Sequence, residues 1–191
     1  MGDPHDRRVA ACNAVADPNA LFVVVSGPPA SGKSTLGSAL AVELGLPLVA
    51  KDTIKDALMS VLPVSDVEAS RQLGGAAVAA MLAVAREAPQ GAVLESNFYR
   101  SVAVEELHGL PGTVVEVFCR CDRGVATTRY RTRAGTRHGG HFDSIRTDEE
   151  LWNEEIAEPV AGGWAVLEVD TNCPIDIAAV VRDIRRVSGA R

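Results

Sequence analysis

The sequence predicts an α/β fold, built on a five-stranded, mostly parallel sheet with helices on both of its faces. Short apolar segments alternate with segments of helical periodicity along the chain. The segments 21–25, 92–95 and 113–119 are apolar almost throughout, which is typical of parallel strands that are covered on both faces. Each parallel connection needs a crossover, and the segments between the strands have the length and periodicity of helices.

The first half of the chain begins with a strand at 21–25, and Leu36, Leu40 and Leu44 then recur at helical spacing. A short strand follows at 47–50. A helix is expected over 52–62, and the capping box Ser65-Asp66-Val67-Glu68 should open a long helix that ends before Pro89 and Gly91.

The second half continues the alternation of strands and helices. Strands are expected at 92–95, 113–119 and 164–169, and helices at 102–107, from 122 to about 133, and from Pro174 onward. A second capping box at Thr147-Asp148-Glu149-Glu150 should start a helix through Glu158. Residues 134–146 lack periodicity and contain three glycines, so we expect a mobile lid there.

Composition favours a small substrate over a long polyanion. The 191 residues are 47% hydrophobic, enough for one domain over 1–191, with residues 1–20 loosely held. The formal net charge of -6 disfavours nucleic acid as a partner. The four cysteines have no disulfide or metal spacing, and no signal peptide or membrane-spanning stretch is visible. We therefore expect a cytoplasmic protein, whose oligomeric state the sequence leaves open.

The strongest motif follows the first strand. Its residues are Gly27, Pro28, Pro29, Ala30, Ser31, Gly32, Lys33 and Ser34, followed by Thr35. They match the phosphate-binding pattern G-x-x-x-x-G-K-[ST], in which backbone amides at a helix N-terminus cradle phosphates. Lys33 is expected to reach the β- and γ-phosphates of ATP, and Ser34 to bind Mg²⁺.

Two acidic residues follow strands whose carboxyl ends should converge on the bound phosphates. Asp52 could accept the proton of a substrate hydroxyl or orient it, or it could only cap its helix. Glu95 could bind Mg²⁺ through water or contact the substrate, or it could be a solvated carboxylate.

Basic residues complete the predicted site. Arg129 and Arg133 share a helix face, and with Arg137 in the lid they could clamp the transferring phosphoryl group. Arg100 is expected among the substrate-binding residues. The pair His138 and His141 has no further ligands at zinc spacing, so we expect lid or substrate contacts from these histidines instead.

The loop Gly27–Thr35, the pair Lys51-Asp52 and the arginine-rich helix and lid resemble the small-molecule kinases of the phosphate-loop class. The chain looks like the group of chloramphenicol phosphotransferase, zeta-toxin kinases and gluconate kinase. The resemblance implies a three-layer P-loop kinase fold, ATP and Mg²⁺ as cofactors, Asp52 as the residue that positions the acceptor hydroxyl, and an arginine-rich lid. Third strands in this group commonly end in aspartate, so the glutamate at position 95 departs from the pattern.

The leading hypothesis is therefore an ATP-dependent kinase that phosphorylates a hydroxyl of an antibiotic, a sugar or a nucleoside-like molecule. A kinase of polynucleotide 5′-hydroxyls is an alternative, because several arginines cluster between Arg120 and Arg133. A non-catalytic, ATP-dependent switch is a third. The guanine-recognition pattern Asn-Lys-x-Asp is absent, which argues against a GTPase.

Overall fold

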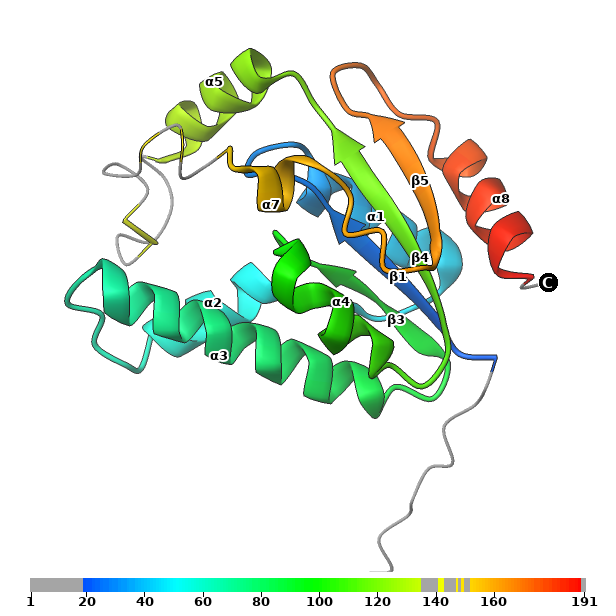
Figure 1. The fold of residues 1–191 in the computed structure, drawn as a ribbon, viewed down its shortest axis with the longest axis horizontal. Coiled ribbons are helices and arrows are strands. Elements are labelled where there is room, and N and C mark those ends of the chain that lie inside the picture. Colours follow the sequence, from blue (N-terminus) through cyan, green and yellow to red (C-terminus); the bar gives the residue numbers. More distant parts are fainter. Residues whose placement is uncertain (1–18, 135–140, 143–146, 148, 150–151, 190–191) are drawn as a thin grey trace, which may run out of the picture.

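A single parallel sheet organises the chain, as the computed structural model shows for residues 19–134, 141–142, 147, 149 and 152–189 (Figure 1). The strands are β1 (Leu21–Ser26), β2 (Leu48–Ala50), β3 (Gly91–Glu95), β4 (Thr113–Arg120) and β5 (Ala165–Asp170). Their spatial order is β2-β3-β1-β4-β5, and every neighbouring pair is parallel. The predicted α/β fold with five strands is confirmed.

Helices cover both faces of this sheet and complete three layers (Figure 1). Helices α1 (Lys33–Leu44) and α8 (Ile177–Ser188) contact each other on one face. Helices α3 (Val67–Arg86) and α4 (Arg100–His108) pack on the other face, and α2 (Lys51–Met59) lies against α3. Helices α5 (Arg123–Ala134) and α7 (Glu154–Ala157) follow β4.

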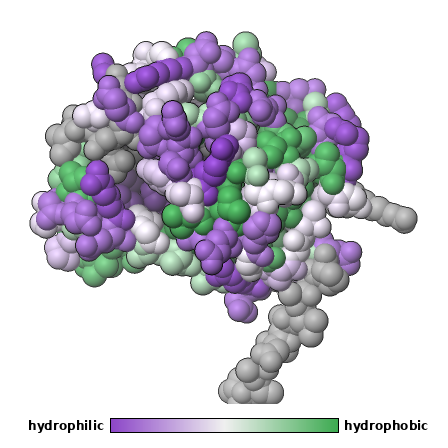
Figure 2. Space-filling model, in the orientation of Figure 1, coloured by the Kyte–Doolittle hydropathy of each residue, from purple (hydrophilic) through white to green (hydrophobic). Residues whose placement is uncertain are grey.

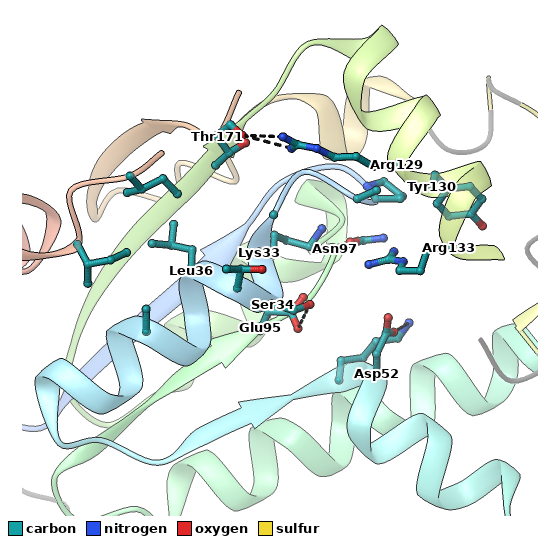
Figure 3. Close-up of a pocket in the computed structure, with 18 of the residues that line it drawn as sticks. Lys33, Ser34, Leu36, Asp52, Glu95, Asn97, Arg129, Tyr130, Arg133 and Thr171 are labelled. Atoms are coloured by element: carbon teal, nitrogen blue, oxygen red, sulfur yellow. Dashed lines mark hydrogen bonds and ion pairs between the residues drawn. The ribbon is translucent and has the colours of Figure 1, made fainter. Parts of the chain in front are cut away.

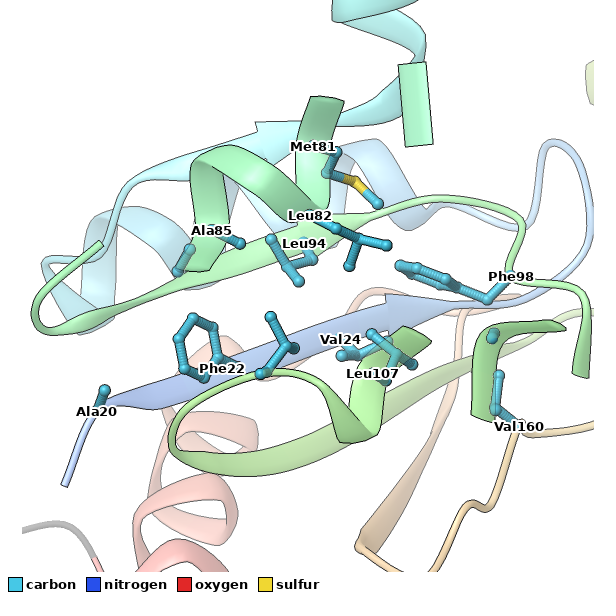
Figure 4. Packing of buried hydrophobic residues seen from close by; sticks show 13 residues of the cluster. Ala20, Phe22, Val24, Met81, Leu82, Ala85, Leu94, Phe98, Leu107 and Val160 are labelled. Carbon is cyan, nitrogen blue, oxygen red and sulfur yellow. The ribbon is translucent and has the colours of Figure 1, made fainter. Parts of the chain in front are cut away.

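The alternation of side chains along β1 divides the core between the two faces. Phe22 and Val24 point toward α3 and α4, where they pack with Met81, Leu94 and Leu107 (Figure 4). Their neighbours Val23 and Val25 point the other way and pack in the cluster that α1 and α8 complete. Because both sets are fully buried, β1 is apolar on both faces, as the sequence predicts.

The outer surface is polar over most of the face drawn in Figure 2, with apolar side chains in small groups among the hydrophilic ones. None of the helices in the described part of the chain has the length and apolar character that a bilayer crossing needs.

Two predicted helix boundaries differ from those in the structure. Helix α3 begins at Val67, and its cap is Asp66, whose Oδ1 accepts from the amide of Ala69 at 2.8 Å. Ser65 instead donates to the Asp66 carboxylate at 2.9 Å, so the cap lies one residue later than predicted and is not a reciprocal capping box. Helix α2 ends at Met59, short of the expected residue 62.

The helix expected over 147–158 is not continuous. Trp152 and Asn153 are not helical, and the Asn153 side chain accepts from the amide of Glu155 at 3.0 Å. An asparagine in this position starts a new helix because it satisfies an amide of the first turn. The helical segment that ends before Glu158 is therefore the short α7.

A buried carboxylate ties the end of β1 to the chain that leads into β5. Glu116 on β4 is fully buried, and it accepts hydrogen bonds from Ser26 Oγ at 2.6 Å and from the amides of Val160 and Ala161 at 2.8 and 2.9 Å. The indole of Trp164 donates to it as well, at 3.2 Å. Since Ser26 immediately precedes the phosphate loop, Glu116 helps to fix the position of that loop.

Candidate active site

The loop between β1 and α1 has the backbone of a phosphate cradle. Gly27 has φ +131°, and a Cβ there would lie 2.8 Å from the Cys119 carbonyl oxygen, so the position requires glycine. Gly32 has φ +92° and is the N-cap of α1, where no side chain caps the helix. Side chains do cap α3, α7 and α8, whereas α2 and α4 lack a side-chain cap as α1 does. The first amides of α1 are thus left for a ligand that lies over the loop.

Lys33 is held back over this loop. Its Nζ donates to the Pro28 carbonyl oxygen at 2.6 Å, and the residue is 5% exposed. Burial lowers the pKa of Lys33, and the nearby Glu95 carboxylate partly opposes that shift. A buried ammonium beside unpaired helix amides makes the loop attractive to a polyanion.

Ser34, which is predicted to bind Mg²⁺, has its hydroxyl in contact with a carboxylate. Ser34 Oγ donates to Glu95 Oε2 at 3.2 Å. Burial raises the pKa of Glu95, while the Lys33 charge works in the opposite direction. Oxygen donors of this kind suit Mg²⁺, so the residues present fit the metal that the sequence predicts.

A cavity of about 560 Å³ joins this loop to the loops at the carboxyl ends of the other strands. It brings together Lys33 and Ser34 with Asp52, Glu95, Arg129 and Arg133, which come from the four elements α1, α2, β3 and α5 (Figure 3). Arg133 projects from α5 and Asp52 from α2 toward the same space. The convergence predicted from strand order is therefore present in the structure.

No family profile and no curated protein matches the chain, but solved structures do. A candidate kinase from Chloroflexus aurantiacus is 32% identical with a TM-score of 0.78, over 88% of this chain and 98% of that one. The chain belongs to the P-loop kinase family. It is a kinase, a phosphotransferase that binds a nucleotide.

More distant kinases share the fold alone. A shikimate kinase from Acinetobacter baumannii, solved with shikimate, is 15% identical with a TM-score of 0.58. The match covers 88% of the present chain and 93% of the shikimate kinase. A gluconokinase from Sinorhizobium meliloti is 21% identical with a TM-score of 0.52, and the match covers 91% of the present chain and 93% of the gluconokinase.

Asp52 stands in the first turn of α2 of this kinase, with its side chain at the cavity. The N-cap of α2 is Ala50, so Asp52 lies in the first turn of the helix and does not occupy the N-cap position itself. The carboxylate contacts Lys51 Nζ at 3.0 Å, and 43% of the Asp52 side chain is exposed. An accessible carboxylate opposite the phosphate loop can reach an acceptor hydroxyl.

The two described arginines of the predicted clamp have different surroundings. Both terminal nitrogens of Arg129 donate to the Thr171 carbonyl oxygen, at 3.2 and 3.3 Å, which links α5 to the loop after β5 (Figure 3). Arg133 lines the cavity one turn further along α5. Arg137 lies outside the described residues.

Some predicted site residues are not brought to this cavity. Arg100, expected to bind substrate, donates from Nε and Nη2 to the Pro159 carbonyl oxygen at 3.1 and 2.6 Å and does not line the cavity. His138 is outside the described residues. His141 does line the cavity, with its Nε2 2.6 Å from Asp56 Oδ1. Among the residues that the structure describes, no cluster of metal ligands accompanies it.

Several residues of the cavity wall are not among the predicted site residues. Lys51 and Lys55 lie four apart on α2, a spacing that places them on one helix face. Asn97 follows β3 and also faces the cavity (Figure 3). No local pattern identifies the wall beyond Thr171, which contains Cys173, Pro174, Ile175 and Ile177.

Proposed function

We propose that this kinase transfers the γ-phosphate of Mg²⁺-ATP to a hydroxyl of a small molecule of the antibiotic, sugar or nucleoside-like kind. The observation that carries the proposal is one continuous cavity with a phosphate cradle, a hydroxyl–carboxylate pair and an accessible aspartate on its walls. Phosphoryl transfer depends mainly on positioning and charge neutralisation, and this cavity offers both.

The nucleotide site is proposed to extend from the loop Gly27–Thr35 toward the loop after β5. The backbone amides at the start of α1 bind phosphate oxygens, and the Lys33 ammonium leaves the Pro28 carbonyl to contact the β- and γ-phosphates. Thr171 and the apolar residues Pro174 and Ile175 form the far wall, which suits a planar base.

Ser34 and Glu95 are proposed to hold the magnesium ion. When bound, Mg²⁺ neutralises charge that develops on the phosphates. The Ser34 hydroxyl would bind the ion directly, and the Glu95 carboxylate, which accepts from that hydroxyl, would orient it or contact the ion through water. We therefore assign Glu95 to the metal side of the cavity.

Asp52 is proposed to position the acceptor hydroxyl and to accept its proton as the new bond to phosphorus forms. Arg133 lies across the cavity from Asp52 and supplies a planar cation to the transferring phosphoryl group (Figure 3). Arg129 is proposed to act beside it, fixed by the Thr171 carbonyl, and Arg137 is expected to join them.

The chain is proposed to act as one domain over residues 1–191.

The arginines between Arg120 and Arg133 are the basis of the alternative that the acceptor is a polynucleotide. Of these, Arg120 pairs with Glu168 at 2.6 Å and with Glu158 at 3.5 Å, and Arg129 is bound to Thr171. The two carboxylates offset the charge of Arg120, and the Thr171 carbonyl holds the Arg129 side chain at the cavity, so the small-molecule acceptor is favoured.

Two variants test this function. Lys33→Ala should abolish ATP binding measured by calorimetry, because it removes the cation of the cradle. Asp52→Asn should keep ATP affinity and lower turnover by about a hundredfold or more, since it removes the proton acceptor. Wild-type protein with Mg²⁺-ATP should give a phosphorylated product in a panel of antibiotics, sugars and nucleosides. Full turnover in Asp52→Asn would contradict the assignment of the base.

A further inference from the structure

A smaller hollow adjoins the active-site cavity, between α3 and α4, which lie on the same face of the sheet (Figure 1). Its volume is about 190 Å³, and we call it the side pocket. Asn97, in the loop after β3, lines both the side pocket and the active-site cavity. Because that loop begins directly after Glu95, the side pocket lies next to the wall that carries the proposed metal pair.

The lining of the side pocket is mainly apolar. Phe98 belongs to the core and is 4% exposed, whereas Tyr99 and Val102 are 44% and 55% exposed. Among the residues that the structure describes, Glu106 is the one charged residue of this lining. Apolar walls with an accessible aromatic side chain are typical of sites for small organic molecules, and a carboxylate on the wall disfavours an anion.

Gly75 keeps the side pocket open from the α3 side. It lies inside this long helix, and a Cβ built at this residue would have nothing within 4 Å. A glycine inside a helix is less favourable than an alanine, because glycine loses more conformational freedom on folding. Since an alanine would fit at this position, packing does not require the glycine. The missing side chain instead leaves open volume between α3 and α4.

The size of the side pocket suits a single ring. Its volume of about 190 Å³ exceeds the roughly 150 Å³ of an engineered protein cavity that binds benzene. Aromatic rings also pack well against side chains such as Phe98 and Tyr99. Because Asn97 and Asp52 line one cavity, a ring in the side pocket can belong to the same molecule as a hydroxyl held at Asp52.

We propose that the side pocket is a specificity subsite for the acceptor, and that the acceptor carries a neutral, benzene-sized ring beside the group that bears the phosphorylated hydroxyl. The proposal rests on the proposed kinase function and narrows its substrate class to alcohols with an apolar ring. Gly75 determines this specificity by the volume that it leaves open, and Tyr99 by the aromatic surface that it offers.

A groove that binds no ligand makes a different prediction. If the side pocket were only a gap between two helices, a side chain that filled it would leave the rates for all acceptors in the same proportion. If another protein covered it, a small ring alone would not bind there. Binding of a small ring, and the loss of that binding when the pocket is filled, therefore separates these possibilities.

Two measurements on the full chain test the inference. Saturation-transfer NMR with benzyl alcohol, in the presence of Mg²⁺-ADP, detects binding of a ring without any transfer of phosphate. Kinetics then compare acceptors that differ in the ring: 2-phenyl-1,3-propanediol with 2-methyl-1,3-propanediol, and benzyl β-glucoside with methyl β-glucoside. Wild-type protein should transfer saturation to benzyl alcohol. Its kcat/KM for one ring-bearing acceptor should be at least about tenfold above that of the partner, because burial removes the apolar ring from water.

Gly75→Leu should abolish both the saturation transfer and the ring preference, with the KM for ATP unchanged. Its thermal stability should not fall, since leucine is a better helix former than glycine. Ala76→Leu is the matched control, because Ala76 is an exposed neighbour on α3 that lines neither hollow, and this variant should keep both properties. Val102→Phe narrows the side pocket from α4, and it replaces Gly75→Leu if the latter does not fold.

Three outcomes would overturn the inference while the kinase function stands: no binding of benzyl alcohol to the wild type, binding that persists in Gly75→Leu, or equal rates for both members of every acceptor pair. Binding of benzyl alcohol without transfer to any acceptor, in the presence of bound ATP, would overturn the kinase function and with it the assignment of the side pocket to an acceptor.

Discussion

The buried carboxylate of Glu116 offers a quantitative test of how the phosphate loop is held in place. Substitution Glu116→Ala removes the acceptor for four hydrogen bonds, from Ser26, Val160, Ala161 and Trp164. Two of these donors, the Ser26 hydroxyl and the Val160 amide, belong to residues that are only 2% exposed and that water does not readily reach.

The expected loss follows from those two donors. Leaving a buried donor without a partner costs about 1–3 kcal/mol, so Glu116→Ala should lower the free energy of unfolding by about 2–6 kcal/mol. That is a large part of the 5–15 kcal/mol, roughly, that a domain possesses. Glu116→Gln keeps the shape and one carbonyl acceptor, so its loss should be smaller.

Urea denaturation followed by far-UV circular dichroism measures this quantity, with the slope against urea checked for constancy. Glu168→Ala is a matched control on the neighbouring strand, because Glu168 is 49% exposed and its pair with Arg120 is of the surface type, worth about 0–1 kcal/mol. If Glu116→Ala were no more destabilising than this control, the buried network would not hold the loop as we describe.

Three further predictions concern the loop, the metal pair and the clamp. Gly27→Ala should destroy ATP binding while far-UV dichroism stays native, since a Cβ would lie 2.8 Å from the Cys119 carbonyl oxygen; tight binding would contradict this reading of the cradle. Burial raises the pKa of Glu95 above 4.5, and metal binding needs the ionised carboxylate. The pH profile of kcat/KM should therefore have an acidic limb: below the pKa of Glu95, which lies above 4.5, kcat/KM should fall about tenfold per pH unit. The limb should vanish in Glu95→Gln, and a limb that persists there belongs to another group. Arg129→Gln should weaken ATP affinity measured by calorimetry, and unchanged affinity would remove Arg129 from the nucleotide site.

The fold and the centre of the site could be predicted because both depend on local signals. Apolar strands and the motif Gly27–Thr35 set the sheet and the cradle, and strand order alone places Asp52 and Glu95 at one edge. The Asn153 cap was missed because the acidic residues after Thr147 gave a stronger local helix start than the asparagine that actually begins α7.

Contacts between residues that are far apart in the sequence could not be predicted. The bond from Arg100 to Pro159 spans 59 residues, and no pattern near Arg100 distinguishes it from a substrate ligand. Lys55 is similar, since its burial depends on α3 packing over α2 and on Ser70, 15 residues away. Such pairings are decided by tertiary contacts, which periodicity and motif spacing do not encode.

The uncapped N-terminus of α1 makes this protein's stability a function of its surroundings. A ligand that binds only the folded chain adds about 2.7 kcal/mol when its concentration is 100 times its dissociation constant. Because nucleotide phosphates would supply the acceptors that no side chain gives at Gly32, the melting temperature should rise with nucleotide concentration. Depletion of nucleotide would then expose the chain to proteases sooner, so energy supply would govern the lifetime of the protein as well as its turnover.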